Sequence, residues 1–244
     1  MCYYNSVEIP DETTITIKGS TKKINAVHLP VQSGFEFANW PIIKAINDTW
    51  QFEMAHWEFI APWNKNWEEV SESRKKITTL NAVGEKLLQS KLYKNAALKK
   101  RCLLLSSGFY EWRHFQSTNA KTPLAYPYFI RVKQKQNFFM AGILQTWTDK
   151  ETGETIDTFA IVTTAVNSLM EQIHNTKKRM PTLLPENLAQ EWLLGNLNEK
   201  RITELATYQL SANELEAWSI DKHFKTALHP QEQKVYEELP EIVL

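Results

Sequence analysis

The chain has 244 residues, of which 43% are hydrophobic and 23% charged, which excludes a disordered chain and supplies material for a core. No apolar stretch approaches the roughly 18 residues of a membrane helix, and no secretory leader pattern is visible, so we expect a cytoplasmic protein. Cys2 and Cys102 are too few for a disulfide-stapled secreted scaffold. A single domain over 2–244 is expected, since β-rich folds of about 200–250 residues are commonly one unit.

The charge is balanced overall but not along the chain. Residues 1–140 hold 19 Lys and Arg against 12 Asp and Glu, whereas residues 141–244 hold 9 against 16. The most basic stretch is 74–101, in which nine basic side chains accompany a single acidic one, Glu85. Charge alone favours a solvated helix face. A phosphate-binding face is the competing interpretation.

Short runs rich in β-branched and aromatic residues predict strands. They are Thr14–Lys18, Trp50–Trp57, Arg101–Trp112, Tyr126–Val132, Asn137–Ile143 and Thr158–Thr164. Helices are predicted at Val83–Lys100, Ala165–Ile173, Pro185–Trp192 and Glu199–Ala206, and hairpin loops at Gly19–Lys23 and Lys150–Glu154. Strands and helices do not alternate regularly, so we expect an α+β fold: a single mixed domain built on a β-sheet or partly closed barrel with peripheral helices.

Several common sites are absent from the sequence. It contains no P-loop, no dinucleotide fingerprint and no GxSxG nucleophile elbow. The histidines and cysteines show neither HExxH nor paired-cysteine spacing. We therefore expect no cofactor and no metal.

Cys2 follows the initiator methionine, and the commonest meaning of such a cysteine is a small, unreactive residue. Removal of Met1, which is common before a small side chain, would leave an α-amine and a thiol on one residue. The amine has an ordinary pKa of about 7.7–8.0 and the thiol of about 8.5, so both are nucleophiles near neutral pH. Such a pair suits aldehydes: the amine forms a Schiff base, and the sulfur closes a thiazolidine ring.

Further motifs follow Cys2 in a recognisable order. They are Trp57–Trp63 (WEFIAPW), Asn81–Glu85 (NAVGE), Arg101–Leu103 with Gly108–Trp112 (GFYEW), Ala141–Ile143, Ile161–Ala165, and Ile173–His174 leading to Arg179–Pro181 (RMP). Together they span most of the chain, and with Cys2 they make the sequence resemble the SOS-response-associated peptidase family. Members of that family sense abasic sites in single-stranded DNA and become crosslinked to them.

The resemblance implies roles for residues that match the family motifs. Cys2 would be the nucleophile, and Asn81 would bind the substrate or orient the amine. Glu111 would shuttle the protons that open the abasic sugar ring, and His174 would exchange protons during imine formation and reversal. Each residue also has an alternative, purely structural interpretation: Asn81 as a loop or helix cap, Glu111 as an exposed strand residue, and His174 as a structural histidine.

The sequence departs from the family pattern at the arginines associated with DNA phosphates. Tyr3-Tyr4 stands where Cys-Gly-Arg is usual, and Val83 replaces the arginine of Asn-Ala-Arg. Losing these contacts would weaken DNA binding and flatten its salt dependence. The segment after His174 is longer than usual and basic. We expect a compensating phosphate track of Lys75, Lys76, Lys177, Lys178 and Arg179.

Trp57, Trp63 and Trp67 cluster just before the basic segment. Most tryptophans are core or surface anchors, but exposed ones beside a basic groove stack on single-stranded bases. Trp63 is the first choice for such a platform, or for the wedge that the family resemblance implies, and Trp67 the second.

The sequence therefore predicts a monomeric enzyme that crosslinks to abasic sites in single-stranded DNA and protects the lesion. When bound to DNA it would be associated with the nucleoid. One alternative is a cysteine peptidase or amidase in which the α-amine of Cys2 serves as the base for its thiol. Another is a non-catalytic single-stranded DNA-binding protein, whose binding would be indifferent to Cys2 and to the lesion.

Overall fold

The computed structural model describes residues 2–116 and 121–243. Its strands are β1 (Tyr4–Ile9), β2 (Thr14–Ile17), β3 (Ser20–Lys23), β4 (Val27–Ser33), β5 (Asn39–Ile46), β6 (Thr49–Trp57), β7 (Asn81–Val83), β8 (Arg101–Ser106), β9 (Gly108–Phe115), β10 (Leu124–Val132), β11 (Phe138–Thr148), β12 (Thr155–Ala165), β13 (Arg179–Pro181), β14 (Leu183–Leu184) and β15 (Leu215–Ser219). The α-helices are α1 (Trp67–Arg74), α2 (Lys94–Lys99), α3 (Ser168–Ile173), α4 (Glu186–Leu194) and α5 (Glu199–Ala206). The 3-10 helices are η1 (Gly34–Glu36), η2 (Gly84–Gln89), η3 (Ala212–Glu214) and η4 (Phe224–Thr226).

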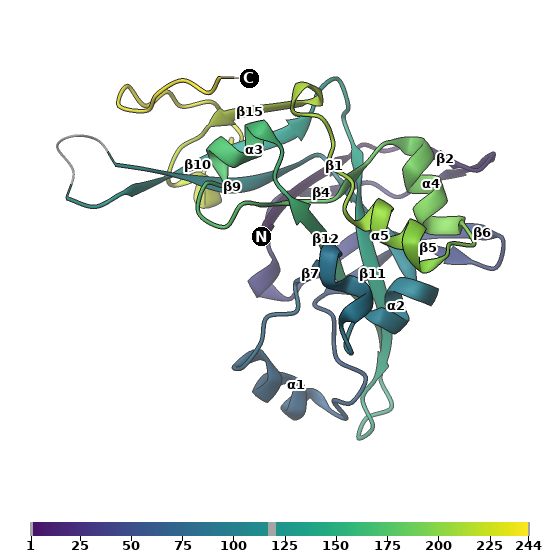
Figure 1. The fold of residues 1–244 in the computed structure, drawn as a ribbon. Coiled ribbons are helices and arrows are strands. Elements are labelled where there is room, and N and C mark those ends of the chain that lie inside the picture. The colour runs from purple at the N-terminus through teal and green to yellow at the C-terminus, as the bar shows by residue number, and fades with distance from the viewer. Residues whose placement is uncertain (1, 117–120, 244) are drawn as a thin grey trace.

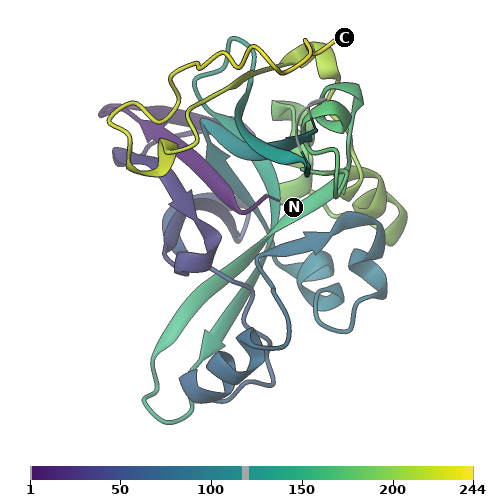
Figure 2. The ribbon, with the colours of Figure 1, turned by 90° about the vertical axis from the view of Figure 1, so that its left-hand side faces the viewer.

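The larger sheet closes on itself. β12 pairs with β6 in parallel and with β11 in antiparallel orientation, and β5 and β8 complete the path β12–β6–β5–β8–β11. The result is a small barrel, to which β7, β13 and β14 add at the rim. Short helices lie at its periphery (Figures 1 and 2). The expected α+β fold with a partly closed barrel is confirmed.

The second sheet has the order β15–β10–β9–β1–β4 and lies above the barrel in Figure 1. The predicted strand Arg101–Trp112 is wrong as a single strand, because Ser107 divides it between the two sheets. At the crossing the Ser106 hydroxyl donates to the side chain of Asn5, 2.7 Å away. A Cβ on Gly108 would lie 2.1 Å from the Phe129 ring, so only glycine fits where the chain changes sheets.

The predicted helix Val83–Lys100 is also wrong as a single helix. Residues 81–83 form a strand, a 3-10 helix follows, and α2 begins only at Lys94. The Ser90 hydroxyl accepts hydrogen bonds from the backbone of Leu92 and Tyr93 (3.2 and 3.3 Å). This local capping competes with helix continuation and accounts for the break. The predictions for the α3, α4 and α5 regions and for the hairpin loop Lys150–Glu154 are confirmed. The predicted loop Gly19–Lys23 is wrong, because Ser20–Lys23 form strand β3, and helix α1 was not predicted.

Aromatic residues fill the core. Trp40, Trp50, Trp57 and Trp192 are fully buried, and the indole nitrogen of Trp192 donates to main-chain carbonyls of both β8 and β11. Arg101 is buried as well, and it donates to carbonyl oxygens at the C-terminal ends of α2 and α4. This arginine satisfies groups that helices leave unpaired. No helix in the described part of the chain is long and apolar enough to cross a membrane.

Candidate active site

Cys2 lies just before β1 and is fully buried. Strand β1 runs beside β9 so that Tyr4 pairs with Tyr110, the residue preceding Glu111. The Cys2 Sγ is 3.9 Å from the carbonyl oxygen of Tyr4, within reach of a weak thiol hydrogen bond. Burial raises the pKa of the Cys2 thiol well above its ordinary value, and the nearby Glu111 carboxyl adds to the rise. The thiol is therefore protonated at rest.

Glu111 and His174 meet across the boundary between β9 and the end of α3. The Glu111 Oε1 lies 3.5 Å from the His174 Nδ1, and both side chains are buried. Burial raises the pKa of Glu111 to about 8 and lowers that of His174 to about 4. Near neutral pH the carboxyl is therefore largely protonated and the imidazole is neutral. The contact is a meeting of two uncharged groups and not an ion pair.

The hydrogen bonds of His174 fix its tautomer. Its Nδ1 is 2.6 Å from the main-chain oxygen of Arg179. A carbonyl oxygen can only accept, so Nδ1 carries the hydrogen and Nε2 holds the lone pair. The backbone around it is a tight turn in which the Lys178 amide donates to the His174 carbonyl (2.9 Å) and Lys178 adopts a positive φ of 50°.

Asn81 begins β7, which pairs with β12 at Ile161. Its side chain is buried, yet neither Oδ1 nor Nδ2 has a hydrogen-bond partner among the described residues. A buried amide left in this state costs about 1–3 kcal/mol per unmet group. In both ribbon views the N-terminal end of β1 lies beside β7 (Figures 1 and 2). The Asn81 amide therefore has an unmet donor and an unmet acceptor on a strand next to the start of β1.

Glu111 thus contacts His174 directly and influences the pKa of the Cys2 thiol, whereas Asn81 lies on β7, which pairs with β12. Sequence reasoning missed two neighbours. Tyr3 packs on Phe35 (ring centroids 4.8 Å apart), and its phenol pKa is raised by burial and by Glu111. Asn175 was also missed: its amide accepts from the His114 backbone N–H (3.1 Å) and donates to the His114 carbonyl (2.7 Å). The sequence did not indicate these hydrogen bonds to β9, because an asparagine in a polar turn is common.

The two predicted aromatic contacts have different surroundings. Trp63 is 56% exposed, in the loop between β6 and α1. Trp67 opens α1 and packs edge-on against Trp147, with ring centroids 4.9 Å apart, and its Nε1 donates to Glu154. Trp63 is the side chain that can offer a face to a nucleotide.

The predicted basic residues lie in two groups. Lys75 and Lys76 follow α1 directly, and Lys177 and Lys178 lie in the turn after α3. In Figures 1 and 2, α1 and α3 are on opposite sides of the N-terminal end of β1. Lys75 pairs with Glu72, and Lys178 pairs with Glu171 (2.5 and 2.7 Å), all with exposed side chains. Such pairs cost little to open, so both groups can still meet phosphates.

Arg179 has a different environment from these lysines. Both of its terminal nitrogens contact the carboxylate of Glu85 (2.8 and 2.7 Å), and one also donates to the Thr163 carbonyl. Its guanidinium is therefore engaged inside the protein. Among residues 2–116 and 121–243, no three His, Cys, Asp or Glu side chains gather in a way that could hold a metal ion.

Comparisons with known proteins identify relatives of this chain. Over 141 residues the chain is 30% identical to a Bacillus subtilis protein named "Abasic site processing protein YoqW", covering 58% of this chain and 59% of the relative. It is 28% identical to the Xenopus tropicalis "Abasic site processing protein HMCES" over 51% of this chain and 40% of that protein. The chain thus spans about three-fifths or less of the length of these relatives.

Solved structures extend the likeness to the fold. A crystal structure of a protein from Bacteroides thetaiotaomicron is 31% identical, with a TM-score of 0.74 over 84% of this chain and 85% of that one. One from Bordetella bronchiseptica shares the fold at 18% identity, with a TM-score of 0.64 over 90% of this chain and all of that one. The family model described as SOS response associated peptidase (SRAP) matches residues 11–227. The chain belongs to the SOS response associated peptidase (SRAP) family.

Proposed function

We propose that the protein bonds covalently to abasic sites in single-stranded DNA through Cys2 and thereby protects the lesion. The observation that carries this proposal is the Asn81 side chain, buried with both polar atoms unmet. A substrate that supplies a hydroxyl or an amine nitrogen at this point would satisfy the amide and offset its desolvation. A deoxyribose whose base has been lost carries such hydroxyl groups, and when its ring opens it carries an aldehyde.

The chemistry requires that Met1, which lies outside the described residues, be removed. The amine nitrogen of Cys2 then attacks the aldehyde carbon, and loss of water gives an imine. The Cys2 sulfur adds to the same carbon, and the thiol proton ends on the nitrogen, which closes the thiazolidine. The raised pKa of the thiol favours this order, because the amine is the better nucleophile until a base is at hand.

The two buried ionisable groups suit the proton transfers. Glu111 is largely protonated near neutral pH, so it can donate to the ring oxygen as the sugar opens, and to the hydroxyl that leaves as water. His174 presents Nε2 as its basic nitrogen and can accept a proton from the amine or the thiol. Their pKa values are pushed in opposite directions, as expected for a site that holds an acid and a base in their uncharged forms.

The surroundings support a single-stranded partner. The exposed Trp63 offers a stacking face. The lysines of α1 and of the turn after α3 are exposed on either side of the N-terminal end of β1. A strand that runs between these groups would pass Cys2. The relatives named as abasic site processing proteins make the same substrate class the leading choice.

The test is intact-mass spectrometry after incubation with an oligonucleotide that contains one abasic site. The untagged protein should first lose the mass of one methionine, and it should then gain the mass of the oligonucleotide minus water. Cys2→Ala should abolish the adduct. Cys102→Ala is the matched control, because Cys102 is equally buried but lies on β8 in the barrel, and it should leave the adduct intact.

The same experiment separates the alternatives. Peptide turnover without an adduct would point to the peptidase or amidase chemistry. Strand binding that is indifferent to the lesion and to Cys2→Ala would point to a non-catalytic binding protein. Either result refutes the crosslinking proposal.

A further inference from the structure

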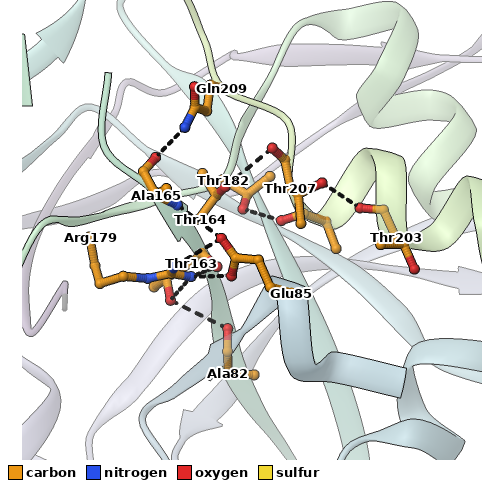
Figure 3. A network of polar contacts seen from close by, with 11 residues as sticks. Ala82, Glu85, Thr163, Thr164, Ala165, Arg179, Thr182, Thr203, Thr207 and Gln209 are labelled. Atoms are coloured by element: carbon orange, nitrogen blue, oxygen red, sulfur yellow. Dashed lines mark hydrogen bonds and ion pairs between the residues drawn. The ribbon is translucent and has the colours of Figure 1, made fainter. Parts of the chain in front are cut away.

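Glu85, which follows β7, and Arg179, which begins β13, form a two-point ion pair. Figure 3 shows the Arg179 guanidinium turned toward the Glu85 carboxylate, with contacts of 2.8 and 2.7 Å, and toward the Thr163 carbonyl. The carboxylate also accepts from the backbone amide of Ala165 (3.2 Å). The side chains are only 39% and 18% exposed. Both partners are therefore tied to strand β12 as well as to each other.

The pair connects the segments that carry Asn81 and His174. Glu85 follows Asn81 by four residues. Between them lies Gly84, which packs closely against α5: a Cβ added to this glycine would lie 2.3 Å from the carbonyl oxygen of the last residue of that helix. Arg179 begins β13, and its main-chain oxygen is the acceptor for the His174 Nδ1. Strands β7 and β13 pair with opposite edges of β12. Thr163 of β12 is paired with a residue of each of these two strands.

We propose that Glu85 and Arg179 are positioning residues for the chemistry at Cys2. The pair holds β7 and β13 together on β12, so that the Arg179 carbonyl keeps Nδ1 of His174 protonated and Nε2 basic. This inference rests on the proposed function. It differs from the sequence-based expectation that Arg179 binds phosphate, because here the guanidinium acts through Glu85 within the protein.

The geometry explains why a side-chain pair is needed at this point. The turn from His174 to Arg179 ends with Lys178 at a positive φ, a conformation that costs a non-glycine residue about 1 kcal/mol or more. The backbone pairing of β13 with β12 begins only at Arg179, opposite Ala165, so the Arg179 carbonyl lies at the end of a ladder of three residue pairs. The planar guanidinium fork meeting a carboxylate fixes both distance and direction. A partly exposed pair adds only about 0–1 kcal/mol of stability, so its main effect would be geometric.

The test compares Glu85→Gln and Arg179→Lys with Glu191→Gln. Glu191 pairs in two-point fashion with Arg201 between α4 and α5, with contacts of 2.7 Å and side chains 34% and 37% exposed, so it is a matched pair away from the site. Adduct formation is measured at saturating abasic oligonucleotide, and DNA affinity is measured separately. Thermal melting shows that each variant is folded.

We expect Glu85→Gln and Arg179→Lys to lower the saturated rate about 10–100-fold, the scale on which misplaced catalytic groups act, with DNA affinity unchanged. Glu191→Gln should match the wild type. If Arg179 instead served phosphate, releasing it from Glu85 would tighten DNA binding and leave the saturated rate alone, which would overturn the inference.

A second readout needs no activity. Nitrogen NMR of His174 should show the Nδ1-protonated tautomer in the wild type and in Glu191→Gln, and a mixture of tautomers in Glu85→Gln. An unchanged tautomer together with an unchanged rate sinks the positioning role. If the wild type forms no adduct at all, the proposed function fails. The tautomer of His174 then decides alone: a change in Glu85→Gln supports the positioning of His174 by the ion pair, and no change refutes it.

Discussion

Replacing Glu111 by glutamine should stabilise the protein, and the gain should grow with pH. Burial raises the pKa of this carboxyl from its ordinary 4.5 to about 8. The unfolded chain therefore releases the proton first, and the folded state loses stability as pH rises from 4.5 through 8. Glutamine is uncharged and close in shape to the protonated acid, so the variant carries no such loss.

The magnitude follows from linkage, in which one pKa unit corresponds to about 1.4 kcal/mol. With the two pKa values above, the variant should be more stable by about 1 kcal/mol at pH 5, about 3 at pH 7 and about 5 at pH 9, and equal to the wild type below pH 4. His174 has the opposite sign: burial lowers its pKa to about 4, so it costs stability only as pH falls below 6.5. That cost is common to both proteins and cancels in the difference.

The assay is urea unfolding of wild type and Glu111→Gln at these pH values, with equal m-values as the check that the same transition is compared. Glu237→Gln, an exposed carboxyl on the C-terminal segment, gives the baseline. A difference that stays constant with pH, or a variant that is less stable at pH 9, would refute the burial argument. The same variant should form the abasic adduct slowly, since it cannot donate a proton as the acid does.

Three further results are expected. Trp63→Ala should weaken single-strand binding by about 1–3 kcal/mol in a fluorescence titration while leaving the melting temperature alone, whereas Trp67→Ala, through its packing on Trp147, should lower stability by about 2 kcal/mol. Reversing the charge of Lys177 and Lys178 together should lower affinity most at low salt and make the slope of log affinity against log salt less steep; an unchanged slope contradicts the phosphate track. Lys178→Gly should raise the free energy of unfolding by about 0.5–1 kcal/mol, because glycine adopts a positive φ without penalty, and a loss of stability would contradict this.

Much of the fold could be predicted from the sequence, and the family resemblance singled out Glu111 and His174, which lie in contact. Alternating and β-branched runs identify the strands because a strand buried on one face must alternate, and Glu199–Ala206 was predicted to the residue. The breaks were not predictable in this way. Ser107 interrupts a continuous apolar pattern through a backbone hydrogen bond to Ser6 that exists only once distant strands have assembled. Ser90 ends a helical pattern through local side-chain hydrogen bonds, which the spacing of apolar residues does not reveal.

The positioning residues show the same limit more clearly. Glu85 lies in a stretch that is otherwise basic, and Arg179 was expected to bind phosphate as one of a run of cations. Their partnership spans 94 positions in the sequence, and it becomes visible only when β7 and β13 lie on β12. Local charge predicts an electrostatic surface, but it cannot say which charge has already been neutralised inside the fold.

The placement of the site between two sheets explains how so many polar groups are buried at once. Glu111 lies on β9 of the five-stranded sheet, and Cys2 lies just before β1 of the same sheet. Asn81 begins β7 at the rim of the barrel, and His174 lies in the segment that joins β12 to β13. Inside either sheet, burial of an unmet amide and an uncharged acid would favour replacement by apolar residues. At the junction Glu111 Oε1 lies 3.5 Å from His174 Nδ1, and the Asn81 amide is buried with both polar atoms unmet. Under the proposed function a substrate would supply partners for the Asn81 amide, so binding rather than folding would recover its desolvation cost.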